Sequence, residues 1–323
     1  MTTIDELMSY ALDPKRIREV VQHIDPTFTV VGVSYLAGGV SANMISVEVS
    51  TNAGNNRKFL LRWHGDIAHD DYPSIVEREY QLLKHLNQQG LTVPKPILLD
   101  KSGEILATTF LVLQFIPGET SFSLPVRDDY LQQAAETLAR IHRLEPHNSI
   151  VLLLPSQIEI CSRKLAERPD HLDASLSEAT IRHVLEAAWP WKTVNKDCLL
   201  HGDFWPGNWL WDKHQLIAII DWEDAKLGDP LADLAISRLE ILWAFGQSAM
   251  ETFTRIYLRN QPSLNLELLP YWDLFSALRP MNQLDAWAPG WAAFGRNDVT
   301  VDTMRQAHSW FISQAFDMLS SRD

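Results

Sequence analysis

Apolar residues along the chain follow one spacing before Pro117-Gly118 and another after it. In the first part they gather in short runs, rich in β-branched and aromatic residues, that are typical of strands. These runs are residues 29–36, 44–49, 59–63 and 109–116. One predicted helix interrupts them, with a capping-box pattern of Ser74 and Glu77 at its start and Gly90 at its end. The first part is therefore expected to be mainly a small sheet.

After Pro117-Gly118 the apolar residues recur at the spacing of a helix. One predicted helix is marked by Leu131, Ala134, Ala135, Leu138 and Ile141, and another spans residues 231–245. The two patterns together predict an α+β protein. A small antiparallel-sheet lobe at residues 1–116 is expected to precede a larger, mainly helical lobe at residues 117–323.

A polar interval inside the second part predicts a β-hairpin. The apolar runs WLW and LIAII flank the polar residues 212–215. If the turn is centred just after His214, Asn208 and Asp221 lie opposite each other at the open end of the hairpin, with Cα atoms roughly 5 Å apart. Two oxygen-bearing side chains are therefore expected to meet there.

The segment before the hairpin adds a third oxygen-bearing side chain. Pro206 disfavours helix for the residue before it and Gly207 frees the next turn, so an irregular loop is expected to bend the carboxylate of Asp203 toward Asn208 and Asp221. Mg²⁺ takes few protein ligands, prefers hard oxygen, and keeps positions for water and phosphate. One carboxylate and one amide suit that ion, and the other carboxylate remains available as a base.

This segment resembles the catalytic and metal-binding loops of the aminoglycoside phosphotransferase and choline kinase superfamily, the small-molecule relatives of protein kinases. The shared pattern is His-Gly-Asp at residues 201–203, Asn208 five residues later, and a strand that ends in Asp221. The resemblance implies a protein-kinase-like two-lobe fold. It also implies that Asp203 is the catalytic base toward a substrate hydroxyl and that Asn208 and Asp221 are magnesium ligands.

The resemblance further implies that residues 1–116 bind the nucleotide, ATP or GTP, and that residues 117–323 form the catalytic and substrate-binding lobe. A turn rich in small residues is the candidate loop over the phosphates; its candidate residues are Gly38, Gly39, Ser41 and Asn43. From the residues alone, an ordinary hairpin turn is the alternative. The backbone of Gln114, Phe115 and Ile116 would be the adenine contact, or simply a strand end before a turn.

An ion pair is predicted between Arg62 and Glu79. Arg62 lies within an apolar strand, and Glu79 falls on the apolar stripe of the predicted helix, where an unpaired carboxylate is costly. The pair has about 4 kcal/mol of Coulomb energy at 4 Å and an effective dielectric constant near 20, before desolvation is subtracted. In the resembled family this strand position is usually Lys, so the fork-like guanidinium changes the expected phosphate geometry.

Composition excludes several other classes of protein. A hydrophobic content of 46% excludes a largely disordered chain. The net charge of −13 argues against a nucleic-acid partner and favours cationic small molecules among the hydroxyl-bearing substrates. No apolar run is long enough to cross a bilayer, so a cytoplasmic protein without a membrane partner is expected. Zinc-type Cys/His clusters and a Walker-type loop are both absent from the sequence.

Further residues are assigned supporting roles. His201 is expected to orient its loop by hydrogen bonding, and the resemblance assigns Asp233 to bracing the same loop. Trp205, inside the loop, is a candidate pocket residue, and Glu240 is a candidate to hold a substrate amine. The sequence thus indicates a phosphotransferase, and the alternative is a catalytically silent, kinase-like nucleotide-binding regulatory protein. The acceptor alcohol, the choice of ATP or GTP, and the oligomeric state are left open.

Overall fold

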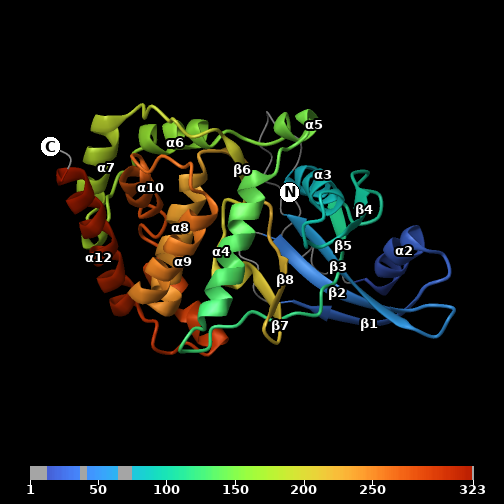
Figure 1. The fold of residues 1–323 in the computed structure, drawn as a ribbon. Coiled ribbons are helices and arrows are strands. Elements are labelled where there is room, and N and C mark those ends of the chain that lie inside the picture. The colour runs from blue at the N-terminus through green and yellow to red at the C-terminus, as the bar shows by residue number, and fades with distance from the viewer. Residues whose placement is uncertain (1–12, 37–41, 65–74, 322–323) are drawn as a thin grey trace. The chain divides into compact units, whose positions relative to one another are not determined.

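Five antiparallel strands form one sheet in the N-terminal part of the computed structural model, in the order β1-β2-β3-β5-β4 (Figure 1). The strands are β1 (Thr29–Tyr35), β2 (Ala42–Ser50), β3 (Asn56–His64), β4 (Pro96–Asp100) and β5 (Phe110–Gln114). The four runs predicted from the sequence correspond to β1, β2, β3 and β5. Strand β4 and the helix α2 (Pro14–Ile24) add to the predicted elements.

The structure describes residues 13–36, 42–64 and 75–321. Their contacts divide the chain into two compact units, Met1–Pro117 and Gly118–Asp323, which are called unit 1 and unit 2 below. None of the helices within the described ranges combines the length and the apolar character that a membrane span needs.

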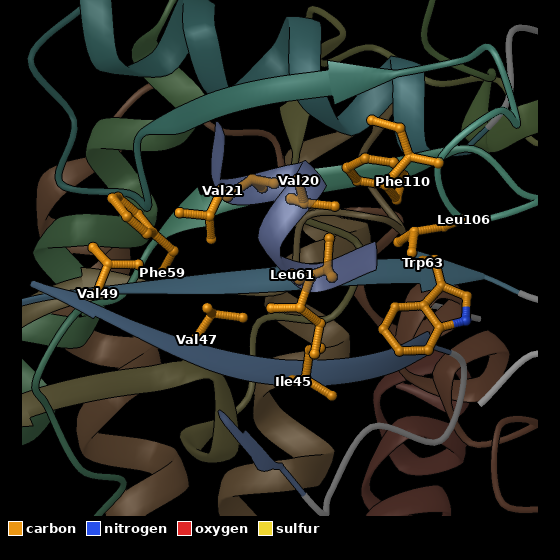
Figure 2. Close-up of a cluster of buried hydrophobic side chains, with 13 residues drawn as sticks. Val20, Val21, Ile45, Val47, Val49, Phe59, Leu61, Trp63, Leu106 and Phe110 are labelled. Atoms are coloured by element: carbon orange, nitrogen blue, oxygen red, sulfur yellow. The ribbon is translucent and has the colours of Figure 1, made fainter. Parts of the chain in front are cut away.

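The hydrophobic core of unit 1 lies between α2 and one face of the sheet, as Figure 2 shows. Asp13 caps the start of α2 and Pro14 occupies its first turn, so the helix begins sharply and turns its apolar side toward the strands. The labelled core residues are Val20, Val21, Ile45, Val47, Val49, Phe59, Leu61, Trp63, Leu106 and Phe110. Because successive strand residues point to opposite faces, Arg62 points away from this core.

Helix α3 (Ile75–Gln88) packs on β3, β4 and β5. Its predicted end is confirmed: Gly90 has a φ of +72°, and the N–H groups of Gly90 and Leu91 donate to the carbonyls of Asn87 and Leu86, both at 3.0 Å. The predicted cap at Ser74 lies outside the described residues.

Unit 2 is mainly helical, with two small two-stranded sheets, β6-β9 and β7-β8. Its elements are α4 (Asp128–Arg143), α5 (Asn148–Val151), α6 (Gln157–Ala166), η1 (Ala174–Leu176), α7 (Glu178–Ala188), β6 (Cys198–Leu200), η2 (Pro206–Asn208), β7 (Trp209–Asp212), β8 (Gln215–Ile219), β9 (Lys226–Gly228), α8 (Pro230–Phe245), α9 (Gln247–Asn260), α10 (Leu269–Ser276), α11 (Leu284–Trp287), η3 (Ala288–Phe294) and α12 (Val301–Ser320). Helix α8 packs against α9, α10, α12 and β6 and is buried on nearly all sides, as its largely apolar sequence predicts. The predicted α+β class is confirmed.

The predicted hairpin forms from β7 and β8, but its register differs from the prediction. Asp212 pairs with Gln215, so the turn consists of Lys213 and His214, one residue earlier than expected. Lys213 adopts a left-handed φ of +55°, which allows this tight turn. The pairing then skips Ile217, which forms a bulge.

The predicted pairing of Asn208 with Asp221 is therefore wrong by one residue. Trp209 lies opposite Ile219, and the N–H of Ile220 donates to the carbonyl of Asn208 at 3.0 Å. Asp221 follows immediately with a left-handed φ of +66°, so it leaves the strand direction just beyond the paired residues.

Candidate active site

The loop between β6 and β7 holds Asp203 and Asn208 against each other. The Nδ2 of Asn208 donates to the Oδ2 of Asp203 at 3.1 Å and to the carbonyl of Asp203 at 2.9 Å. Two backbone bonds tighten the loop, from Trp205 N–H to the carbonyl of Asp203 at 3.0 Å and from Asn208 N–H to the carbonyl of Trp205 at 2.9 Å. The amide nitrogen of Asn208 therefore faces Asp203, and its amide oxygen does not.

Asp233, in the first turn of α8, anchors the start of this loop. Its side chain is fully buried; Oδ2 accepts the N–H of His201 at 2.6 Å and Oδ1 accepts the N–H of Gly202 at 2.8 Å. His142 lies 3.2 Å from Oδ2 through Nε2, and the Tyr257 hydroxyl lies 2.7 Å from the other ring nitrogen. Burial raises the pKa of Asp233, but hydrogen bonding and the charge of His142 outweigh it, so the net shift is downward. Asp233 is thus a buried carboxylate that positions the loop backbone.

His201 links the loop to the end of β8. Its Nε2–H donates to the carbonyl of Ile220 at 3.0 Å, and its Nδ1 accepts the N–H of Asp203 at 3.2 Å. Both ring nitrogens are used and the residue is fully buried. The orienting role expected for His201 is confirmed by these contacts, and they bring Asp221, the residue after Ile220, next to the Asp203 loop.

Glycine is required between His201 and Asp203. Gly202 has a φ of +83°, and a Cβ at this position would overlap the backbone carbonyl oxygen of Asp224. Residue 202 can therefore approach the segment that follows β8 only because it has no side chain.

Asn208 and Asp221 offer the donor atoms that a magnesium ion prefers. An amide oxygen and a carboxylate are hard oxygen ligands, and Ile220, which precedes Asp221, is bonded to Asn208 and to His201. In the described part of the chain, no group of three or more His, Cys, Asp or Glu residues forms a dedicated metal cage. One amide oxygen and one carboxylate suit an ion that takes few protein ligands, as Mg²⁺ does.

Arg279 joins this site, and no sequence pattern marks it. Its Nη2 lies 2.5 Å from the Oδ1 of Asp203 and 3.9 Å from the Oε1 of Glu240, and its Nη1 donates to the carbonyl of Gly202 at 3.4 Å. Arg279 follows α10 and is 76 residues from Asp203 in sequence, so only the packing of α8 and α10 brings the groups together.

Glu240 lies on α8 and is buried beside Arg279. Burial raises its pKa from 4.5 to about 7; Arg279 acts in the opposite direction, and the negative charge of Asp203 adds to the rise. The folded protein therefore holds a proton on Glu240 that the unfolded chain releases above pH 4.5. The contribution of this proton to the free energy of unfolding is fully present below pH 4.5 and is lost as the pH rises through about 7.

Replacing Glu240 by glutamine should reduce the pH dependence of stability. With 1.36 kcal/mol per pKa unit, the wild-type free energy of unfolding should fall by roughly 2 to 3 kcal/mol more than that of Glu240→Gln between pH 5 and pH 8. Urea unfolding at a series of pH values measures this. The exposed residue Glu251 gives the control, Glu251→Gln, which should follow the wild-type curve. Parallel curves for the wild type and Glu240→Gln would refute the assignment.

Trp205 lies in an aromatic cluster beside the loop. Its ring centroid is 6.1 Å from that of Phe122, 5.9 Å from Trp291 and 6.2 Å from Phe294. The indole folds back over Gly207, where a Cβ would overlap it. Two rings of this cluster, Phe122 and Phe294, line a pocket of about 520 Å³ together with other residues of 119–124, 295, 296 and 298. The expected role of Trp205 in substrate binding stays a prediction.

Unit 1 contains the residues predicted to bind the nucleotide. The predicted ion pair is confirmed: Arg62 Nη1 lies 3.0 Å from Glu79 Oε1, and both side chains are buried. Gln114, at the end of β5, is exposed, and its N–H donates to the carbonyl of Lys95; Phe115 follows with its N–H on the carbonyl of Lys58. The remaining predicted contact of this segment is Ile116, which is partly buried.

The predicted phosphate loop falls mostly outside the described residues. This applies to Gly38, Gly39 and Ser41, whereas Asn43 lies in β2 opposite Trp63. The nucleotide contacts of all these residues stay predictions.

Comparison with known proteins identifies relatives of this chain. Residues 34–266 match the model of the phosphotransferase enzyme family (APH). Acyl-CoA dehydrogenase family member 11 of Rattus norvegicus is 28% identical over 234 residues, which are 63% of this chain and 29% of that protein. This chain thus spans less than a third of the length of that relative.

Solved structures share the fold at low sequence identity. Amicoumacin kinase hAmiN, in complex with AMP-PNP, Ca²⁺ and Ami, aligns with a TM-score of 0.62 and 16% identity over 98% of this chain and 96% of its own. Spectinomycin phosphotransferase APH(9)-Ia, in complex with ADP and spectinomycin, aligns with a TM-score of 0.60 and 14% identity over 94% and 97% of the two chains. These matches confirm the predicted kinase-like fold.

Proposed function

Because this chain belongs to the phosphotransferase enzyme family, we propose that it transfers the γ-phosphoryl group of a nucleoside triphosphate to a hydroxyl group of a small molecule. The observation that carries the proposal is the setting of Asp203. The amide of Asn208 and the guanidinium of Arg279 each hold one of its carboxylate oxygens. A carboxylate held in this way can orient an acceptor hydroxyl and accept its proton.

In the proposed reaction the acceptor oxygen forms a bond to the γ-phosphorus while its proton passes to the carboxylate of Asp203. The bond between the γ-phosphorus and the bridging oxygen breaks, and the nucleoside diphosphate leaves with that electron pair. Asn208 and Asp221 would hold Mg²⁺, which neutralises phosphate charge when bound. The donor atoms of the two side chains support this assignment.

Unit 1 would supply the nucleotide contacts. We assign the phosphates to Arg62, supported by Glu79, together with the loop that contains Gly38, Gly39, Ser41 and Asn43. The adenine or guanine ring is assigned to the backbone of Gln114, Phe115 and Ile116. The buried ion pair supports the first assignment, because a guanidinium held at 3.0 Å by Glu79 is pre-oriented for an oxyanion. The AMP-PNP and ADP in the related structures support a purine nucleoside triphosphate, ATP or GTP, as the donor.

Mass spectrometry tests the proposed reaction directly. The protein would be incubated with MgATP or MgGTP and a panel of hydroxyl compounds that includes cationic, neutral and anionic members. A phosphorylated acceptor that forms together with nucleoside diphosphate supports the proposal. Tight nucleotide binding without transfer to any acceptor would favour the alternative of a silent regulatory protein.

Replacing Asp221 by asparagine should weaken MgATP binding by about tenfold or more, because a charged metal ligand becomes neutral. Calorimetry with ATP in the presence of Mg²⁺, and again with a chelator, separates the metal contribution from direct nucleotide contacts. The two proteins should differ only when Mg²⁺ is present. Asp212→Asn, at an exposed position in the same hairpin, is the control. An unchanged affinity of Asp221→Asn for MgATP would contradict its role as a ligand.

A further inference from the structure

Arg279 stands at the reacting end of the proposed base. Its Nη2 is 2.5 Å from the Oδ1 of Asp203, the shortest contact that the guanidinium makes, while Glu240 is farther away at 3.9 Å. The side chain is 26% exposed, so the charge is largely removed from water but one part of it remains accessible. Arginine stays protonated, so a positive charge is fixed beside the proposed base.

The guanidinium has hydrogen-bonding capacity that the described residues do not use. Nη2 contacts Asp203 and Nη1 contacts the carbonyl of Gly202. Nε is buried, and none of the described residues accepts a hydrogen bond from it. A guanidinium carries five N–H donors in one plane, a geometry that matches the oxygens of a phosphoryl group.

The reaction itself would bring an oxyanion to this position. An acceptor hydroxyl that donates to Asp203 lies about 2.7 Å from a carboxylate oxygen, and the phosphorus is bonded to that hydroxyl oxygen during transfer. The phosphoryl oxygens then lie on the order of 5 Å from Asp203, within reach of a side chain that already contacts it. When Asp203 takes the proton, Arg279 loses its main anionic partner as negative charge develops on those oxygens.

We propose that Arg279 is a catalytic residue that contacts the transferred phosphoryl group in the transition state and in the phosphorylated product. The proposal rests on the phosphotransferase function given above. In the resting site Arg279 also holds the Oδ1 of Asp203. Its charge is therefore in place before the phosphoryl group arrives, and no side chain has to be recruited during transfer.

Replacing Arg279 by glutamine should lower kcat by about 10²-fold, the loss expected for one donor to a developing oxyanion, and leave the acceptor KM within about threefold. Arg279→Lys, which keeps the charge but not the fork, should restore part of the loss. The control is Arg127→Gln, because Arg127 is also paired with an aspartate, Asp129, but at an exposed position. Arg127→Gln should retain wild-type kcat.

A double substitution separates contact with the phosphoryl group from orientation of Asp203. If Arg279 only positions Asp203, adding Arg279→Gln to Asp203→Asn should not lower the residual rate further. If Arg279 contacts the phosphoryl group, the rate should fall again by about tenfold or more. A double variant as fast as Asp203→Asn alone would overturn the proposal.

Binding of a phosphoryl mimic provides a readout that does not depend on turnover. Calorimetry would compare MgADP with MgADP plus aluminium fluoride, in the presence of the acceptor. Arg279→Gln should bind MgADP like the wild type, which also shows that it is folded, but should lose at least about tenfold of the added affinity from the fluoride complex. Equal affinities of the two proteins for that complex would overturn the proposal. Failure of the wild type to transfer phosphate or to bind MgADP would instead refute the proposed function.

Discussion

Replacing Asp203 by asparagine should lower kcat for phosphoryl transfer by about 10²- to 10⁴-fold while nucleotide binding is retained. The carboxamide has nearly the same shape and cannot take the proton of an attacking hydroxyl. It offers one acceptor oxygen where Asn208 and Arg279 both donate, so one of these two hydrogen bonds is also lost. Retained MgATP affinity shows that the variant is folded. Asp203→Ala should lose at least as much rate, because it also leaves Arg279 without its nearest anion.

Steady-state kinetics with a phosphorylated acceptor, together with MgATP calorimetry, measure this effect. Asp129→Asn is the matched control, since Asp129 is also paired with an arginine but lies at the exposed start of α4. It should retain the wild-type kcat. Equal rates for the wild type and Asp203→Asn would show that Asp203 is not the base, even if transfer itself is confirmed.

The strands and the ion pair of unit 1 follow from local patterns. The runs that became β1, β2, β3 and β5 alternate or concentrate apolar residues between polar turns, which is how half-buried and buried strands are recognised. The Arg62–Glu79 pair is predictable because a carboxylate inside an apolar helix stripe requires a cation, and Arg62 is a cation within an apolar strand. Helix α2 also has a local signal, Asp13 followed by Pro14, but it is short.

The hairpin register could not be obtained from the sequence. It depends on Lys213 adopting a positive φ, which is uncommon for lysine, and on a bulge at Ile217 that no residue type marks. The earlier turn shifts the strand pairing in one direction, and the bulge shifts it partly back. Asp221 therefore lies only one residue beyond its predicted position opposite Asn208. The loop that contains Asp203 still lies next to Ile220, because the hydrogen bond from His201 to the carbonyl of Ile220 does not depend on the pairing of β7 with β8.

Arg279 and Glu240 illustrate a different limit. Neither belongs to a motif, and Arg279 reaches Asp203 across 76 residues through the packing of α8 and α10. The spacing of apolar residues predicts that α8 is a buried helix. It does not predict which distant side chain contacts a polar residue of α8 such as Glu240. The contact of Arg279 with Asp203 and Glu240 is therefore visible only in the structure, whereas the proposed base and the proposed metal ligands can be identified from spacing.

Replacing Asp233 by asparagine should both destabilise the protein and slow the reaction. The carboxylate accepts the N–H groups of His201 and Gly202 with different oxygens and also contacts His142. An asparagine offers one acceptor and an NH₂ group, so one buried backbone N–H would face another donor. We expect a loss of about 3 kcal/mol or more in the free energy of unfolding.

The kinetic effect of Asp233→Asn follows from geometry. Asp203 directly follows the two anchored residues, and a shift of about 1 Å in a catalytic group can lower a rate by about 10²-fold. Urea unfolding gives the stability, and kcat per folded molecule gives the positional effect. Glu178→Gln is the matched control, because Glu178 is a buried carboxylate on α7 that accepts the backbone N–H of Asp173 and pairs with Arg182, away from the loop. It should lose stability but keep its kcat; an equal loss of kcat in both variants would mean that the anchor of Asp233 does not set the position of Asp203.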